Sequence, residues 1–321
     1  MLIRHLKNTI LWLSLLLTTI TIDTHAQQLP LFAQHPEYHG HINPASLNID
    51  YLVDGRNLSF GASMRQQWVQ LGELSPSTQV LRGEYINDDY NIITGGYLMR
   101  DKVGITYNAM AQGRFAYVLK TGSSLEEGGI SLGLNLGLAN WFLKTDRLSL
   151  NQIDDPDLLQ RPSSWYPDLG IGVFWYQQIG GASSHYFYMG LSAPRTFDFR
   201  SDQQGAKRLP HYYGLLGYYH PLGFSENGFF EASMWSRYVA NLPIQTSFHL
   251  KIQPIPQFML GIGAVADFKS RPLMVVEAGI NIPSYAKNSI IRLGYSYTYG
   301  SFISHFGATH EINLAFTLDT R

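Results

Sequence analysis

The chain of 321 residues contains no cysteine. This absence excludes disulfide bonds, thiolate nucleophiles, iron–sulfur clusters and zinc sites with cysteine ligands. Charge is also scarce, because Asp, Glu, Lys and Arg make up only 15% of the residues, against about 25% in an average soluble protein. The 23 Lys and Arg residues nearly balance the 24 Asp and Glu residues. A nucleic-acid-binding protein would show a basic excess, so we expect no nucleic-acid partner.

The sequence also lacks an apolar run long enough for a membrane-spanning helix, which needs about 20 residues. The first 26 residues instead have the three parts of a secretory signal peptide. Arg4 and Lys7 precede the short apolar stretch 10–22, and residues 24–26 (THA) form a cleavage site of small residues. We therefore predict a signal peptide over residues 1–26, with an uncleaved anchor as the alternative. If the mature chain lies in a membrane, only a closed β-barrel can satisfy its backbone there.

What the chain does contain is alternation of apolar and polar residues. In residues 244–253 (IQTSFHLKIQ) apolar side chains dominate the even positions and polar side chains fill the odd positions. Residues 130–141, 291–299 and 311–318 alternate in the same way, which is the period of a β-strand. We find about fifteen such runs of about ten residues, the length of a transmembrane strand. Bacterial barrels have even strand numbers, so we predict about fourteen strands.

Alternation alone does not separate a membrane barrel from a soluble β-sandwich. The runs are long, and their polar faces carry small neutral residues rather than the Lys and Glu of a soluble exterior. Aromatic residues gather near the ends of runs, as in the girdles of membrane barrels: Trp175, Tyr176, Tyr218, Tyr219, Tyr297 and Tyr299. We therefore predict an all-β fold, a single transmembrane antiparallel β-barrel over residues 57–321. Residues 144–167 and 193–210 are predicted surface loops, and residues 27–56 form a periplasmic or plug-like segment.

A few charged residues fall on the polar faces of these strands, where alternation places them in the barrel lumen: Glu231, Arg237, Lys251, Glu277, Arg292 and Glu311. Buried charges must pair or reach water. The simpler interpretation is a charge network that fixes the barrel interior. The alternative is a polar conduit or a docking site for a plug.

Motifs of catalysis and cofactor binding occur only in unsuitable contexts. Residues 129–133 (GISLG) match the nucleophile elbow and residues 261–266 (GIGAVA) match a dinucleotide-binding motif. Both lie inside alternating strands without the helix that each motif requires. His35, His39 and His41 could ligate a metal, but three histidines in a periplasmic segment are usually solvated. We therefore predict no catalytic, cofactor-binding or metal-binding residue, and no enzyme.

Short motifs occur in order along nearly the whole chain. The N-terminal motif consists of Phe32, Gln34, Asn43, Pro44 and Ala45. The motifs in the barrel are carried by residues 115–117 (FAY), residues 129–133, and Arg65, Gln67, Trp68, Gly294, Tyr295, Tyr297, His310 and Glu311. Together these motifs resemble the PorP/SprF family, outer-membrane proteins of the Bacteroidetes type IX secretion system. The chain departs from the family pattern at Phe115, Thr298 and Thr309.

The resemblance implies an outer-membrane protein, in contact with its lipids, that assists secretion or surface anchoring of a cargo protein, such as a gliding adhesin. The cargo would carry a C-terminal sorting domain, and the barrel would contact periplasmic ring components of the machine. It implies neither an enzymatic activity nor a cofactor. The alternative function is a passive outer-membrane channel or small-molecule transporter.

Overall fold

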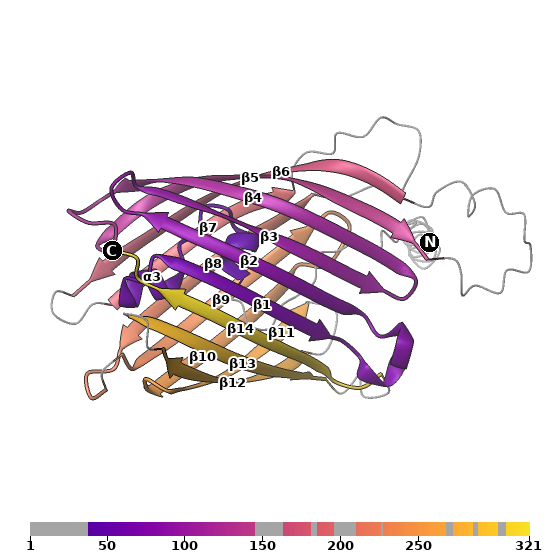
Figure 1. The fold of residues 1–321 in the computed structure, drawn as a ribbon. Helices are drawn as coiled ribbons and strands as arrows, with labels where there is room; N and C mark the ends of the chain where they lie inside the picture. Colours follow the sequence, from indigo (N-terminus) through magenta and orange to yellow (C-terminus); the bar gives the residue numbers. More distant parts are fainter. Residues whose placement is uncertain are drawn as a thin grey trace, which may run out of the picture.

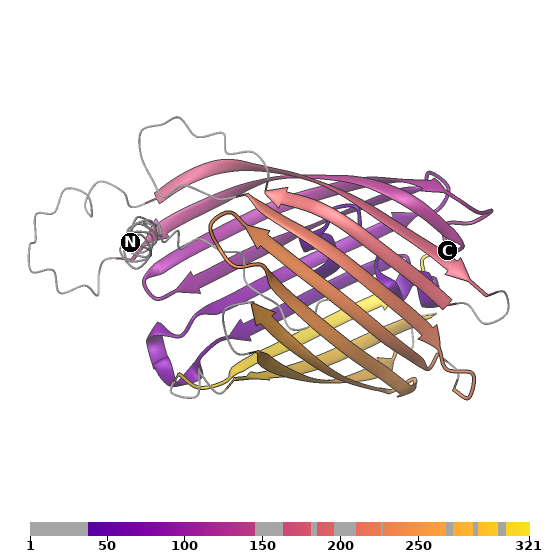
Figure 2. The same cartoon turned by 180° about the vertical axis from the view of Figure 1, so that it is seen from behind.

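The computed structural model describes residues 38–144, 163–180, 185–195, 210–225, 227–267, 272–284, 288–300 and 306–321. Fourteen antiparallel strands follow one another around a closed barrel, and β1 pairs with β14 to complete the wall. Figures 1 and 2 show this wall from two opposite sides. The predicted all-β transmembrane barrel of about fourteen strands is confirmed.

The strands run between the following residues: β1 Leu58–Gln66, β2 Ser77–Asn87, β3 Ile92–Val103, β4 Thr106–Lys120, β5 Gly128–Leu143, β6 Ser163–Ile179, β7 His185–Arg195, β8 His211–Pro221, β9 Phe229–Val239, β10 Gln245–Ile255, β11 Phe258–Asp267, β12 Leu273–Pro283, β13 Ser289–Tyr299 and β14 Thr309–Leu318. Two short helices, α2 (His39–Ile42) and α3 (Ile49–Asp54), precede β1, and the 3-10 helix η2 (Val69–Leu74) follows it. None of the helices in the described residues is long and apolar enough to cross a membrane.

Alternation along each strand divides the wall into two faces. In β10, Phe248, Leu250 and Ile252 are exposed, whereas His249 and Lys251 between them are almost completely buried. The exposed face of the barrel is therefore apolar and the buried face is turned to the interior. This is the arrangement that lipid outside the wall requires.

Two details of the sequence analysis differ from the structure. Two of the about fifteen alternating runs, one beginning near residue 102 and one near residue 114, fall largely on a single long strand, β4, which explains the surplus run. The predicted loop 144–167 also extends too far, since β6 already begins at Ser163. Pro167 lies within this strand, opposite Leu138. Proline has no N–H group to donate within a sheet, so the local sequence argued against a strand here. Pairing with the long strand β5 nevertheless keeps these residues in the sheet.

The two ends of the barrel differ in the length of their connections. At the end that carries the start of β1 and the end of β14, the strands are joined by short turns, such as residues 256–257 between β10 and β11. The opposite end carries the longest connections, residues 144–162 and 196–210. Helix α3 lies at the end with the short turns, beside the C-terminus (Figure 1). We call the two ends the turn end and the loop end.

Candidate functional site: a segment held inside the barrel

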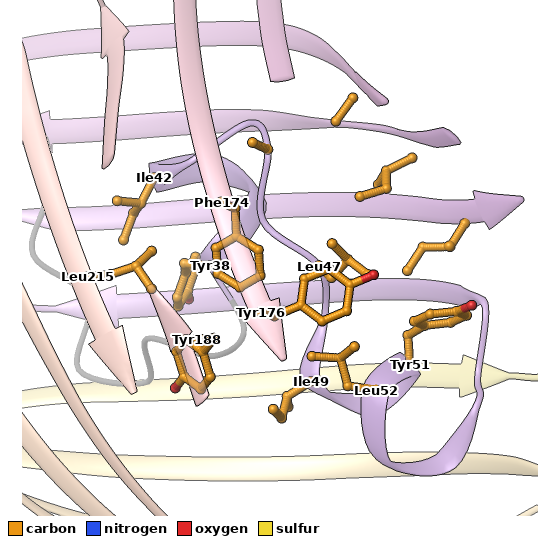
Figure 3. Close-up of a cluster of buried hydrophobic side chains, with 14 of the residues drawn as sticks. Tyr38, Ile42, Leu47, Ile49, Tyr51, Leu52, Phe174, Tyr176, Tyr188 and Leu215 are labelled. Carbon is orange, nitrogen blue, oxygen red and sulfur yellow. The ribbon is translucent and has the colours of Figure 1, made fainter. Parts of the chain in front are cut away.

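Residues 38–57, here called the inner segment, lie inside the barrel and lead into β1. Most of their side chains are buried, and the apolar ones pack against the inner faces of β6, β7 and β8. Figure 3 shows this cluster, which includes Tyr38, Ile42, Leu47, Ile49, Tyr51 and Leu52 of the inner segment and Phe174, Tyr176, Tyr188 and Leu215 of the wall. Each such side chain contributes about 1.5–3 kcal/mol when buried. The inner segment is thus part of the hydrophobic core.

The turn Asn43-Pro44-Ala45 is fixed by its own side chains and by the wall. The Asn43 carboxamide oxygen accepts a hydrogen bond from the Ala45 amide at 2.9 Å. Its amide nitrogen donates to the Val173 carbonyl of β6 at 3.0 Å. Asn43 and Ala45 are completely buried, and the ring of Pro44 fixes one backbone dihedral angle. The Asn43-Pro44-Ala45 part of the N-terminal motif is therefore a rigid turn bonded to the barrel wall.

Three glycines make room for this turn on neighbouring strands. A Cβ atom at Gly133 of β5 would lie 2.4 Å from the Ala45 nitrogen. A Cβ atom at Gly172 of β6 would lie 2.0 Å from the Asn43 carboxamide oxygen, and one at Gly190 of β7 would lie 2.6 Å from the Asn43 amide nitrogen. Real Cβ atoms do not approach other atoms so closely. The absence of side chains here lets the backbone of the inner segment approach the wall closely.

Arg114 of β4, the strand next to β5, also bonds the inner segment to the wall. Its guanidinium group donates to the carbonyl oxygens of Pro44 at 3.1 Å and Ser46 at 3.0 Å. The same group pairs with Glu84 of β2, so the buried charge is compensated, as burial demands. On the other side, the Ser192 hydroxyl of β7 donates to the Ile42 carbonyl at 2.7 Å. The Ile42 carbonyl, which the short α2 leaves without a helical partner, is thus bonded to the wall.

Helix α3 is anchored at the turn end by charge. Arg292 of β13 holds the Asp50 carboxylate through two hydrogen bonds of 2.7 and 3.2 Å, which is the strongest ion-pair geometry for arginine. The helix ends at Gly55, whose φ of 67° favours glycine. The Gly55 carbonyl accepts a hydrogen bond from Arg321 at 2.6 Å, and Arg321 also pairs with Asp88 of the β2–β3 turn at 2.6 Å.

Two buried histidines belong to α2. The His39 ring lies 4.9 Å from the Trp235 ring, and the His41 ring meets the edge of the Tyr97 ring at 4.2 Å. Burial lowers the pKa of both histidines from 6.5 to about 3. The positive charges of Lys251 near His39, and of Arg195 near His41, act in the same direction. Both imidazoles are therefore neutral at pH 7.

The charged residues singled out on the polar strand faces have their side chains on the inner side of the wall. Glu277 pairs with Lys251 at 3.1 Å and with His249 at 2.9 Å. Glu231 accepts a hydrogen bond from the Tyr188 hydroxyl at 2.6 Å. Arg237 donates to Gln245 at 2.6 Å, and Arg292 and Glu311 pair with Asp50 and Arg65. The structure thus gives each of these six side chains a partner.

The motif residues at the two ends of the barrel sequence meet where the wall closes. Arg65 of β1 faces Glu311 of β14 in the register, and the two form a buried ion pair of 3.0 Å. Gly294 faces the interior beside them on β13. On the outer face, the Tyr295 hydroxyl bonds to the His310 ring at 2.7 Å, and the Tyr297 ring meets the same imidazole at 5.5 Å.

Other motif residues lie apart from the inner segment. Gln67 and Trp68 are in the connection after β1, where the Gln67 amide donates to the Pro76 carbonyl at 2.8 Å. The Trp68 ring lies 6.1 Å from the Phe306 ring. Phe32 and Gln34, like His35, lie outside the described residues. The structure therefore brings Asn43, Pro44 and Ala45 to the wall but does not gather all motif residues in one site.

Sequence reasoning missed the partners that hold the inner segment: Arg114, Asp50, Ser192 and the glycines at positions 133, 172 and 190. One of them had a usable signal, because Arg114 alternates with the exposed Phe115 and Tyr117 and so faces inward. Within the described parts of the chain, no three His, Asp or Glu side chains are gathered as a metal site would need. The contacts described above can hold a peptide segment in place inside the barrel.

Several solved structures resemble this fold at low sequence identity. The toluene transporter TodX of P. putida is 8% identical, with a TM-score of 0.46 over 87% of this chain and 94% of TodX. Omp33 of Acinetobacter baumannii is 6% identical, with a TM-score of 0.43 over 82% of this chain and 98% of Omp33. CdiB of Acinetobacter baumannii is 10% identical, with a TM-score of 0.42, and the match covers 82% of this chain and 60% of CdiB.

The sequence comparisons are more specific than the structural ones. Among curated proteins, no relative matches the chain. A family model for the type IX secretion system membrane protein PorP/SprF matches residues 24–316. This match includes every motif residue discussed above and nearly the whole barrel. The chain therefore belongs to the PorP/SprF family of type IX secretion system membrane proteins and lies in the outer membrane.

Proposed function

We propose that this protein is a non-enzymatic partner-binding barrel of the type IX secretion system. In this role it assists the secretion or surface anchoring of a cargo protein with a C-terminal sorting domain. It also contacts ring components of the machine in the periplasm. Membership of the family supports the link to secretion, and the inner segment supports a barrel that acts as a scaffold.

The observation that carries this proposal is the burial of the inner segment inside the barrel. Two cavities flank the segment, one beside α3 and one beside α2, with volumes of about 40 and 30 Å³. Since a water molecule needs at least about 10–15 Å³, these cavities suit a few water molecules. The segment is also bonded to β4, β6, β7 and β13. We infer that it acts as a plug and that the working surfaces of the protein are its two ends.

The two ends differ in the way that outer-membrane barrels do. Such barrels have short periplasmic turns and longer extracellular loops. By this rule the turn end, with α3 and the C-terminus, faces the periplasm and the ring components. The loop end faces the cell surface and the cargo.

Deletion of the gene, followed by proteomics of the cell surface and the medium, tests the role in secretion. We expect at least one cargo protein with a C-terminal sorting domain to be lost from the surface, and the wild-type gene to restore it. An unchanged set of surface proteins contradicts the proposal. A tagged barrel should also co-purify with periplasmic ring components.

A second experiment separates the scaffold from a passive channel. The purified barrel in a planar lipid bilayer should show no sustained current, because the inner segment blocks the lumen. A variant that lacks residues 38–54 should conduct if it folds, and migration on unheated gels checks its folding. A sustained open-pore current through the wild-type protein contradicts the plugged scaffold and favours a channel.

A further inference from the structure

The outer face of the barrel wall is almost free of charge. In the described strands, only two Asp, Glu, Lys or Arg side chains point outward, Arg100 and Lys102 of β3. Both are positive, both lie near the loop end, and they are two residues apart on the same face of one strand. Charge on the lipid face costs least near the membrane surface. Two cations there suggest an anionic group at the level of the lipid headgroups.

A groove of about 720 Å³ on the outer face begins beside Arg100. Its lining includes the small side chains of Ala62 on β1 and of Ala109 and Ala111 on β4. Larger apolar side chains share this surface: Leu81 and Leu98 lie on the two strands between Ala62 and Ala111, and Leu314 lies beside Ala62 on β14, each about half exposed. The volume lies within the range of about 300–1,000 Å³ that is common for ligand sites. Its lining suits hydrocarbon chains.

Aromatic side chains mark the level of the membrane surface next to the groove. The Arg100 guanidinium lies over the Tyr107 ring at 5.2 Å, and Tyr107 stacks on Phe142 with 5.0 Å between the ring centres. Trp165, at the rim of the groove, is 69% exposed. Such rings sit at the headgroup level of membranes. Arg100 is therefore oriented by Tyr107 at the depth where lipid phosphates lie.

Lys102 adds a second donor group at this rim. Its amino group donates to the Glu73 carbonyl in η2, and an ammonium group has three donors, so two can reach a ligand. The carboxylate between the two cations, that of Asp101, points to the interior and accepts a hydrogen bond from Thr78 at 2.7 Å. The outward-facing charge on this strand is thus purely positive.

We propose that this groove is a binding site for a phosphorylated glycolipid of the outer leaflet, the lipid A part of lipopolysaccharide. Arg100 and Lys102 bind a phosphate group, and acyl chains occupy the groove over Ala62, Ala109 and Ala111. The loop end faces the cell surface, and lipid A is the anionic lipid of that leaflet. Basic residues beside a hydrophobic membrane surface recognise lipid headgroups in the same manner. This site is separate from the inner segment and does not depend on the proposed role in secretion, but it rests on the orientation proposed above, with the loop end at the cell surface.

Native mass spectrometry of the purified barrel with lipid A, phosphatidylglycerol or phosphatidylethanolamine tests the proposal. We expect lipid A to remain bound in preference to the other two. The double variant R100Q/K102Q should bind lipid A about tenfold to thirtyfold more weakly, because each cation near an anionic lipid surface contributes roughly a factor of five. K120Q, which removes an exposed cation at the turn end, is the matched control and should bind normally.

A second pair of variants tests the groove itself. A111W places a bulky side chain in the groove without changing its charge and should also weaken lipid A binding. A278W places the same side chain on the outer face of β12, away from the groove, and should not. Gel migration of unheated samples confirms that each variant is folded. Undiminished binding by folded R100Q/K102Q or A111W overturns the site, and equal binding of phosphatidylglycerol overturns lipid A as its occupant.

Discussion

Arg65 and Glu311 form a buried ion pair of 3.0 Å between the first and the last strand. The two side chains are 6% and 0% exposed, so water contributes little to the stabilisation of either charge. Breaking such a pair by removing one partner costs about 3–5 kcal/mol, whereas replacing both partners by apolar residues can be nearly neutral. Removing one partner alone should therefore weaken the junction of the first and last strands more than removing both.

For this pair we expect E311M to lower the free energy of unfolding by about 3–5 kcal/mol, because it leaves the guanidinium group without its counter-charge. The double variant R65M/E311M should lose much less. Urea titration in detergent micelles, followed by tryptophan fluorescence, measures both values. Equal losses in the single and the double variant would show that the ion pair itself is unimportant.

The close contact at Gly133 leads to a prediction for the inner segment. G133V places methyl groups where the Ala45 backbone lies, and overpacking costs about 1–3 kcal/mol. We call the inner segment undocked when it has left its contacts with the barrel wall. We expect the undocked fraction of the molecules to rise about fivefold or more. Since the chain has no cysteine, maleimide labelling of a single L47C variant reports undocking directly.

The matched control for that substitution is G113V on β4. A Cβ atom at Gly113 would have no neighbour closer than 4.0 Å, so labelling of L47C should not change. If G133V and G113V label at the same rate, Gly133 does not hold the segment in place.

Acid should loosen the inner segment. Burial lowers the pKa of His39 and His41 to about 3. Between about pH 6.5 and pH 3, both imidazoles are therefore neutral while the segment is docked, and they bind a proton when it undocks. Docking is therefore strongest above pH 6.5 and weakens as the pH falls toward 3. At pH 4.5 the loss is on the order of 2–3 kcal/mol per histidine.

Hydrogen–deuterium exchange of residues 39–47, corrected for the intrinsic effect of pH, measures this loosening. The charges of Lys251, Arg114 and Arg82 near His39, and of Arg195 near His41, also oppose protonation. The variant H39Q/H41Q should show the same exchange at pH 7 and pH 4.5. A pH dependence that persists in this variant would assign the effect to other groups.

Two arginines that contact the inner segment should contribute unequally to the stability of its docking. The Arg292 side chain is 12% exposed and binds Asp50 through two bonds, whereas the Arg321 side chain is 43% exposed. R292Q should therefore weaken docking by several kcal/mol, and R321Q by less than about 1 kcal/mol. Labelling of L47C in each background compares them, and a larger effect of R321Q would contradict this ranking.

The fold was predictable because alternation repeats along nearly every strand, and the rule of even strand numbers corrected the count. The number of alternating runs exceeded the number of strands by one, because two runs belong to the single strand β4. The contacts of the inner segment were not predictable in the same way. Gly133, Gly172 and Gly190 are far apart in the sequence, and only the register of β5, β6 and β7 brings them to the turn Asn43-Pro44-Ala45. Asp50 and Arg292 are separated by 242 positions, a distance over which local patterns carry no information.

The closed wall around the inner segment has a consequence for the order of assembly. Residues 38–57 come before β1, whereas the wall closes only when β1 meets β14 near the end of the chain. A segment bonded to β4, β6, β7 and β13 can contact its partners while the sheet is still open along one edge. The most direct route is therefore for the sheet to curl around the segment, with the pairing of the first and last strands as the final step.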